Sequence, residues 1–556
     1  MLQDEKEKEL LDRISDLEIQ IKKLKDRKRY GLVWEEKIEK FEKESKNALP
    51  ILREKGGDFS DIVTDNKKDF NILIEGDNYH TLSVLAYTHK NKVDVIYIDP
   101  PYNTGNKDFV YNDHFVDKED RYRHSKWLSF MAKRLKLAKS LLKKEGVIFI
   151  SIDDNEQAGL KLLCDEIFSD VSGKGYIGTL IWQRAKGGGN SKKVVKGHEY
   201  ILCYSRSDEL TLTREGDKSS EHFKRYRSGK VKGKYIFKSN KLYFINDDII
   251  RRVFGKYEKG TERRCEYENL LKFKGEKLKK EVDEKIENGE YILKEITNGN
   301  HYICRLEEVG DMRQVMYTIV QGFLSEVGKN DLAQLEMEEL FEYPKPVGLI
   351  QVLLNTVFDE HITVLDFFAG SGTTGQAVLD LNKKDDGNRK FILCTNNENN
   401  ICENITYERI KRVSIGYKNA KGEKVEGLGG NLKYLKTDFV PLEKSADSLK
   451  QKIVEGSVEI ICLKENTFDL VSDTYKKNKI KIFQNQKKYT AILFDLFYFD
   501  DFVEQLKTLK DKPVAIYVFS YTKDFSKEEF SDVGIDFTVE PIPEKILETY
   551  KKIFHF

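Results

Sequence analysis

One ten-residue stretch, Val93 to Tyr102, constrains the fold of this 556-residue chain more than any other. It begins as an apolar, β-branched run that is typical of a buried strand, and it ends in two adjacent prolines. Because neither proline can donate to a sheet ladder, the strand has to end there. The pattern therefore predicts that Asp99 and Tyr102 lie at the carboxyl edge of a sheet, where open α/β folds bind their ligands.

The tetrapeptide Asp99-Pro100-Pro101-Tyr102 combines a carboxylate, rigid carbonyl groups and an aromatic face. Such groups can stack on a flat heterocycle and accept hydrogen bonds from its amino group. The chain has only nine prolines, so an adjacent pair framed by Asp and Tyr is not expected from composition alone. The alternative is a plain strand that ends in a Pro-Pro turn.

A second stretch, Thr363 to Leu379, has the pattern of a strand, a glycine turn and a helix. Gly370 and Gly372 allow the backbone to approach a ligand closely, and the N-terminus of the following helix favours negative charge. Dinucleotide dehydrogenases also use a Gly-x-Gly turn, so this motif alone does not identify the ligand.

Together the two motifs resemble the DNA amino-methyltransferases that use S-adenosylmethionine, whose hallmarks are Asp-Pro-Pro-Tyr and Phe-x-Gly-x-Gly. The tetrapeptide precedes the glycine turn, which is the motif order of the β class of that family. The chain is closer still to the modification subunits of type III restriction–modification systems, which it resembles at Ile74–Asn78, Tyr343–Pro346 and Thr395–Asn399. The resemblance covers residues 70–205 and 340–415 with specific motifs.

The resemblance implies an α/β, Rossmann-like methyltransferase fold, and the alternation of strand and helix patterns likewise favours a parallel sheet. It also implies an inserted target recognition domain. Apolar spacing in the first 48 residues predicts an N-terminal helix, and strand and helix patterns after residue 440 predict a C-terminal α/β domain. The expected division is a helical or coiled-coil segment at 1–48, the catalytic half of the core at 49–204, the target recognition domain at 205–342, the cofactor half at 343–440 and an assembly or DNA-clamping domain at 441–556.

The activity implied by the resemblance is transfer of a methyl group from S-adenosylmethionine to the 6-amino group of an adenine rotated out of the duplex. Asp99 and the carbonyl of Pro100 would accept the two amino hydrogens, and Tyr102 would stack on the base. Adenine is preferred to cytosine because type III relatives methylate adenine, whereas the residue chemistry leaves both bases open. The catalytic set is Asp99, Pro100, Pro101 and Tyr102.

The resemblance also suggests which residues hold the cofactor. In the family, an acid at the position of Asp77 lies near the cofactor's adenine, although a turn aspartate without function is the alternative. The segment that contains Lys345 covers the methionine end, and Glu398 is the candidate partner of the ribose hydroxyls. The expected cofactor-binding set is Asp77, Lys345, Pro346, Asp366, Phe368, Gly370, Gly372, Thr373 and Glu398.

The chain has 95 basic and 94 acidic residues, so its net charge gives no general attraction to DNA. A DNA-binding surface therefore requires basic residues that cluster in one region. Residues 214–264 carry 16 Lys or Arg and 7 Asp or Glu, with aromatic residues between them. Such a surface suits phosphate contacts and target recognition, and a solvated, variable surface domain is the alternative. A basic, glycine-rich loop follows residue 183. The expected DNA contacts are Arg184, Lys186, Lys192, Lys193, Arg225, Lys230, Lys232 and Lys234.

The seven cysteines are scattered and form no Cys-x-x-Cys motif, which argues against a zinc site and for a reducing cytoplasm. No apolar run approaches the length of a membrane span. We therefore expect a cytoplasmic protein without a metal site and without membrane contact.

The expected partners follow from two further patterns. An apolar seam on the N-terminal segment predicts a helix that packs on a second copy or on the chain's own core; the seam consists of Leu10, Ile14, Leu17, Ile21 and Leu24. No Gly-x-x-x-x-Gly-Lys-Ser/Thr motif follows a strand, so an ATP-dependent restriction subunit would be a separate chain. We thus expect double-stranded DNA, a homodimer and such a subunit as partners.

Three alternatives to this function remain open on the sequence. The chain could be an orphan or other phage-defence DNA methyltransferase, or a DNA-reading subunit without catalysis. The glycine turn would also fit a nicotinamide-dependent oxidoreductase, although that function leaves the proline tetrapeptide unexplained.

Overall fold

The computed structural model describes residues 34–214, 235–238, 241–245 and 266–554, with short internal gaps. The gaps are residues 36, 38, 40, 42–44, 46, 58, 67, 107, 112–113, 170–174, 188–193, 208–209, 272–275, 296–298, 308–313, 358–360, 420, 443–444, 473–478 and 521–524. Seven of the predicted features lie outside the described residues: the seam at 10–24, Lys192, Lys193, Arg225, Lys230, Lys232 and Lys234.

The chain divides into two compact units. Unit 1 comprises Met1–Leu210, Thr318–Gln351 and Asp359–Phe556. Unit 2 comprises Thr211–Tyr317 and Val352–Phe358.

A ten-stranded sheet forms the centre of unit 1, in the order β1-β20-β2-β17-β16-β3-β6-β8-β7-β15. β20 through β6 run parallel to one another, whereas β1 and β8 run antiparallel to their neighbours. This sheet confirms the predicted α/β fold. The strands are β1 (Ala48–Glu54), β20 (Asn431–Pro441), β2 (Phe70–Glu75), β17 (Lys390–Thr395), β16 (Thr363–Asp366), β3 (Val93–Ile98), β6 (Leu142–Ile152), β8 (His198–Ser205), β7 (Tyr176–Gln183) and β15 (Ile319–Val320).

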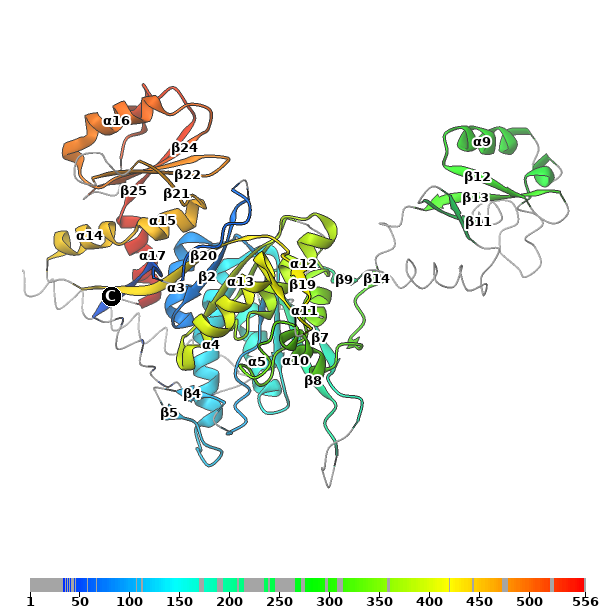
Figure 1. Cartoon of the computed structure of the whole chain (residues 1–556), viewed down its shortest axis with the longest axis horizontal. Helices are drawn as coiled ribbons and strands as arrows, with labels where there is room; N and C mark the ends of the chain where they lie inside the picture. The colour runs from blue at the N-terminus through cyan, green and yellow to red at the C-terminus, as the bar shows by residue number, and fades with distance from the viewer. Residues whose placement is uncertain are drawn as a thin grey trace, which may run out of the picture. The chain divides into compact units, whose positions relative to one another are not determined.

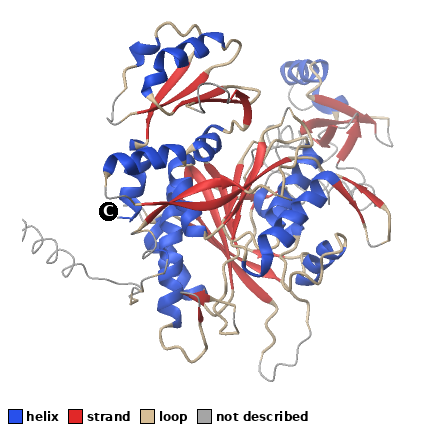
Figure 2. Ribbon diagram, turned by 60° about the vertical axis from the view of Figure 1, so that its left-hand side comes forward, coloured by secondary structure: helices blue, strands red, loops and turns tan. Residues whose placement is uncertain are grey.

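Helices cover both faces of this sheet (Figure 2). On one face α3 packs on α4 and α4 packs on α5, and on the other α12 packs on α13. Strand β17 has apolar side chains on both faces of the sheet, and both sets are buried under helices. Its Ile392 and Cys394 join the core under α3, whereas Phe391 and Leu393 face Gly375 of α12. The helices are α3 (Asn78–Thr88), α4 (Arg123–Leu141), α5 (Gln157–Phe168), α11 (Val347–Leu354), α12 (Thr373–Asp385) and α13 (Glu408–Ile415).

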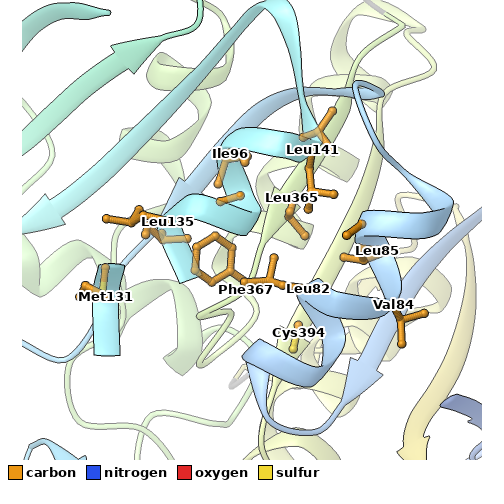
Figure 3. Close-up of a cluster of buried hydrophobic side chains, with 14 of the residues drawn as sticks. Leu82, Val84, Leu85, Ile96, Met131, Leu135, Leu141, Leu365, Phe367 and Cys394 are labelled. Carbon is orange, nitrogen blue, oxygen red and sulfur yellow. The ribbon is translucent and has the colours of Figure 1, made fainter. Parts of the chain in front are cut away.

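The main hydrophobic core joins the two sequence motifs (Figure 3). Ile96 of β3 and Leu365 of β16 are paired in the sheet and fully buried. Leu135 of α4 and Leu82 of α3 belong to the same cluster. Burying such side chains supplies most of the favourable free energy of folding, at about 1.5–3 kcal/mol for each. The core therefore holds together segments that are far apart in the chain.

Unit 2 contains a four-stranded antiparallel sheet in the order β10-β11-β13-β12, on which α9 packs (Figure 1). Leu278 and Val282 of α9 bury against Ile303 of β13. The unit is shorter than the predicted insertion at 205–342, because β15 returns to the central sheet beside β7. The elements are β9 (Thr213–Arg214), β10 (Tyr235–Lys238), β11 (Lys241–Ile245), η2 (Tyr267–Asn269), α9 (Glu276–Glu287), β12 (Tyr291–Glu295), β13 (His301–Glu307) and β14 (Gln314–Val315).

The C-terminal segment has a sheet of its own but is tied to the core of unit 1. Its five strands follow the order β21-β22-β23-β24-β25, and α16 covers them (Figure 1). The hydroxyl of Tyr550 on α17 donates to the carbonyl of Pro50 in β1 at 2.5 Å. The elements are α14 (Ala446–Glu455), α15 (Val458–Glu465), β21 (Asp469–Ser472), β22 (Ile480–Gln484), β23 (Tyr489–Leu493), α16 (Phe499–Thr508), β24 (Val514–Phe519), β25 (Phe537–Ile542) and α17 (Glu544–Phe554).

Smaller elements complete the described chain: β4 (Val110–Tyr111), β5 (His114–Phe115), α10 (Ser325–Ala333), η4 (Glu398–Asn400), η5 (Ile401–Tyr407), β18 (Gly416–Lys418), β19 (Lys424–Glu426), η6 (Leu496–Tyr498) and η7 (Lys527–Phe530). A search of the described residues for a helix long and apolar enough to cross a membrane finds none.

We expect Leu135→Ala to lower the free energy of unfolding by about 2–5 kcal/mol, because removing a fully buried leucine leaves a cavity. Leu137→Ala on the same helix is the matched control, since Leu137 is only partly buried, and its loss should be clearly smaller. Urea unfolding followed by tryptophan fluorescence, to which the buried Trp127 of α4 contributes, measures both variants. Equal losses in the two variants would contradict this core.

Candidate active site

The site lies where neighbouring parallel strands end. Asp99 follows β3, and the turn with Gly370 follows β16, which is the adjacent strand. Asp77 follows β2, and Glu398 follows β17. Because these four strands are parallel, their carboxyl ends meet at one edge of the sheet, as the sequence predicted.

A cavity of about 590 Å³ opens at this edge. Six of the predicted site residues line it: Asp77, Asp99, Pro101, Phe368, Gly370 and Glu398. The other predicted catalytic and cofactor residues do not belong to its lining; these are Pro100, Tyr102, Lys345, Pro346, Asp366, Gly372 and Thr373. The structure thus brings both motifs to one cavity, and seven of the predicted residues lie outside its lining.

Asp366 and Thr373 hold the glycine turn in place from behind that wall. One carboxylate oxygen of Asp366 accepts from the backbone N–H of Phe368 at 3.0 Å, and the other accepts from the hydroxyl of Thr374 at 2.5 Å. Burial raises the pKa of Asp366 to about 7. The hydroxyl of Thr373 accepts from the buried guanidinium of Arg409 at 2.9 Å.

The glycine turn needs glycine for its backbone conformation. Gly370 has φ of +49° and Gly372 has φ of +79°, a region that other residues enter only with strain. A Cβ atom at 372 would lie 3.3 Å from the side chain of Thr406. Backbone strain and contact with Thr406 would therefore both oppose a side chain at position 372.

Asp77 begins α3 as its N-terminal cap. Its Oδ1 accepts from the backbone N–H of Tyr79 at 2.7 Å, and its Oδ2 lies 3.4 Å from the guanidinium of Arg134. The side chain of Asp77 is 44% exposed, so its carboxylate can reach a ligand in the cavity while it caps the helix.

Arg134 and Glu39 form part of the cavity wall, and the sequence analysis missed both. The guanidinium of Arg134 donates to Oδ1 of Asn78 at 2.5 Å and to Oε2 of Glu39 at 2.9 Å. Burial raises the pKa of Glu39, while Arg134 acts in the opposite direction. Phe41 stacks on Tyr79 with 3.8 Å between ring centroids. No motif marks these residues, because only tertiary packing brings the segment before β1 to the site.

The proline tetrapeptide is anchored from both sides. The indole N–H of Trp127 on α4 donates to the carbonyl of Pro101 at 2.7 Å. Asn103, which follows the tetrapeptide, is fully buried with φ of +55°, and its amide donates to Glu156 at 2.5 Å. These contacts stiffen the loop that presents Asp99.

Asp99 is held by two hydrogen-bond donors. Lys345 donates to its Oδ2 at 2.6 Å, and the hydroxyl of Tyr102 donates to its Oδ1 at 2.9 Å. Burial raises the pKa of Asp99, and the ammonium of Lys345 opposes this shift. For Lys345, burial acts to lower the pKa, but Asp99 and Glu199 raise it above the ordinary value. Lys345, from the segment expected to cover the methionine end of the cofactor, thus pairs with Asp99.

The described candidate DNA contacts lie at the end of β7. The guanidinium of Arg184 donates to Oε1 of Glu199 at 2.7 Å, and its side chain is 40% exposed. Lys186 is exposed in the loop that follows. Arg184 therefore links the predicted DNA-binding loop to the site through Glu199, which no sequence motif marks.

Comparison with known proteins agrees with this arrangement. Residues 93–421 match the family model described as DNA methylase, for N6 and N4 methyltransferases. The chain is 34% identical to the Mod subunit of the type III restriction–modification enzyme StyLTI of Salmonella typhimurium over 392 residues. That match covers 63% of this chain and 57% of the relative, so the chain spans little more than half of the relative's length.

Two further proteins are similar. The type II methyltransferase M.KpnI of Klebsiella pneumoniae is 31% identical over 380 residues, which covers 63% of this chain and 89% of the relative. The solved structure of the cytosine-N4-specific PvuII DNA methyltransferase has a TM-score of 0.32 and 11% identity, covering 63% of this chain and 94% of that one. A TM-score this low supports no inference from structural similarity. The family match, however, extends over more than half of the chain and includes both motifs, so the chain belongs to the N6/N4 family of DNA methylases.

Proposed function

We propose that this protein is a site-specific DNA methyltransferase that transfers a methyl group from S-adenosylmethionine to the 6-amino group of adenine. We further propose that it is the modification subunit of a type III restriction–modification system. One observation carries the catalytic part of the proposal: Asp99 of the tetrapeptide and Gly370 of the glycine turn line the same cavity. A methyl donor and an amino acceptor have to meet within one such space.

The residues of the cavity suit S-adenosylmethionine. Its volume of about 590 Å³ falls within the range usual for small-molecule sites, about 300–1,000 Å³. The carboxylates of Asp77 and Glu398 can accept hydrogen bonds from hydroxyl and amino groups. The ring of Phe368 can pack on a flat base or face a cation. When bound, S-adenosylmethionine supplies an electrophilic methyl group on a positively charged sulfur.

Residues of the tetrapeptide would orient the amino group of the target base for methyl transfer. Asp99 and the carbonyl of Pro100 accept its two hydrogens, which directs the nitrogen lone pair towards the methyl group. The ring of Tyr102 offers a face on which a base rotated out of the duplex can stack. The methylated nitrogen then loses one proton, and the carboxylate of Asp99 is placed to accept it.

Methylation of cytosine at its 4-amino group is the second candidate, because the matching family includes N6 and N4 methyltransferases. A solitary type II enzyme is the alternative to a type III subunit, favoured by the 89% coverage of M.KpnI. Incubation of DNA with the protein and S-adenosylmethionine, followed by mass spectrometry of the nucleosides, separates the two bases. The appearance of N4-methylcytosine alone would contradict the proposed adenine specificity.

The DNA substrate and the protein partners are also proposed. Double-stranded DNA is the substrate, and the unit Thr211–Tyr317 is the proposed target recognition domain. A homodimer and a separate ATP-dependent restriction subunit stay predictions, since the predicted seam lies outside the described residues. Sedimentation of the purified protein tests the homodimer.

Asp99→Ala should reduce methyl transfer by about a hundredfold or more, because the target amine loses its acceptor. S-adenosylmethionine binding in the absence of DNA should persist. Asp94→Ala is the matched control: Asp94 lies on β3, the strand that Asp99 follows, and it is outside the cavity lining. It pairs with Lys143 at 2.6 Å and accepts from the backbone N–H of Thr363 at 2.9 Å. Near-normal methylation by Asp99→Ala, measured with radiolabelled cofactor, would refute the assignment.

Gly372→Ala should weaken S-adenosylmethionine binding about tenfold, because left-handed backbone strain of about 1–2 kcal/mol distorts the turn. Gly289→Ala is the control, since Gly289 has φ of +76° in a turn of unit 2 and no neighbour within 4 Å of the added Cβ atom. Isothermal titration calorimetry gives both affinities. If the two variants bind the cofactor equally well, the turn at 372 does not shape the site.

A further inference from the structure

Glu199 is a buried carboxylate beside Asp99 to which the proposed chemistry gives no role. It is the second residue of β8, and it is 5% exposed. Strand β8 runs antiparallel to β6, whereas β3 runs parallel to β6. The first residues of β8 therefore lie at the sheet edge where β3 ends, which places Glu199 next to Asp99.

Both oxygens of Glu199 contact groups of the site. Arg184 donates to Oε1 at 2.7 Å. The hydroxyl of Tyr102 lies 2.9 Å from Oε2 of Glu199 and 2.9 Å from Oδ1 of Asp99. The ammonium of Lys345 lies 3.7 Å from the same Oε2 and 2.6 Å from Oδ2 of Asp99. The two carboxylates thus share two donors.

Sharing affects how well Asp99 can accept a further hydrogen bond. The hydroxyl of Tyr102 has one hydrogen, so it donates fully to only one carboxylate at a time. The ammonium of Lys345 is attracted to both carboxylates, and charges in a poorly hydrated site interact strongly. Lys345 already donates to Asp99, so removing the charge of Glu199 would turn the Tyr102 hydroxyl to Asp99 and tighten its pairing with Lys345. Asp99 would then be a weaker acceptor for the hydrogen of a target amine.

We propose that Glu199 is a positioning residue for methyl transfer, which shares the Tyr102 hydroxyl and the charge of Lys345 with Asp99 and so keeps Asp99 a strong acceptor for an amino hydrogen. The proposal rests on the methyltransferase function proposed above. Glu199 is not part of the cavity lining, so it acts on the target base through Asp99 and its donors.

Glu199→Gln tests the proposal, because it removes the charge and keeps the shape of the side chain. With excess enzyme on target DNA, single-turnover methylation should slow at least about tenfold. The dissociation constant of S-adenosylmethionine, measured without DNA, should stay within about twofold, which also shows that the variant is folded. Glu199→Asp should recover part of the rate. An unchanged rate in Glu199→Gln would overturn the proposal.

A matched control lies at the end of α15 in the C-terminal segment. Glu465 is also a largely buried carboxylate that accepts from a tyrosine hydroxyl, Tyr517 at 2.6 Å, and pairs with a lysine, Lys488. Glu465→Gln should leave the single-turnover rate within about twofold of wild type, because this carboxylate lies on α15, outside the cavity lining, and shares no partner with Asp99. A rate loss as large as that of Glu199→Gln would show a general effect of removing a buried charge, and it would overturn the proposal.

A double variant tests whether Glu199 acts on methyl transfer through Asp99. In an Asp99→Asn background, Glu199→Gln should slow methylation by less than about twofold, because residues that act as a unit are not additive. A further tenfold loss there would overturn the proposal.

If the wild-type protein does not methylate DNA, the proposed function fails and this proposal fails with it. If the wild type methylates and Glu199→Gln is equally fast, this proposal alone fails.

Discussion

The parallel pairing of β3 with β16 is the constraint on which the rest of the structure depends. Val95 pairs with Val364 and Ile96 with Leu365, which aligns two segments from distant parts of the chain in one register. Because side chains alternate between the faces of a strand and both faces are buried here, a slip by one residue would exchange the side chains that pack on the two helix layers. The same register places Asp99 and the glycine turn at one sheet edge, so the core that stabilises the fold also assembles the cavity.

Ion pairs hold the side chains around Asp99 in place. Asp99 and Glu199 are balanced by Lys345 and Arg184, with separations of 2.6 to 3.7 Å for the three ion pairs. An uncompensated charge in such a place would be costly, so each of these groups depends on the others. The site is therefore a network in which the acceptor strength of Asp99 is set jointly by its neighbours.

Peripheral segments complete the structure around this centre. The segment before β1 adds Glu39 to the cavity wall through Arg134, and α17 fastens the C-terminal segment to β1 through Tyr550. Neither segment carries a recognisable motif. Their contribution to unit 1 comes from packing and from hydrogen bonds made across long distances in sequence.

The sequence by itself determined the two motif strands, the α/β class of the fold and the edge at which Asp99 and Gly370 lie, since prolines, glycines and apolar runs act locally. It also marked Asp77 and Glu398, which line the cavity. Only the tertiary structure decided that Lys345 pairs with Asp99, that Asp366 serves the turn and that Glu199 and Glu39 join the site. The physical reason is that these contacts depend on strand order, strand direction and helix packing, and local sequence patterns encode none of the three.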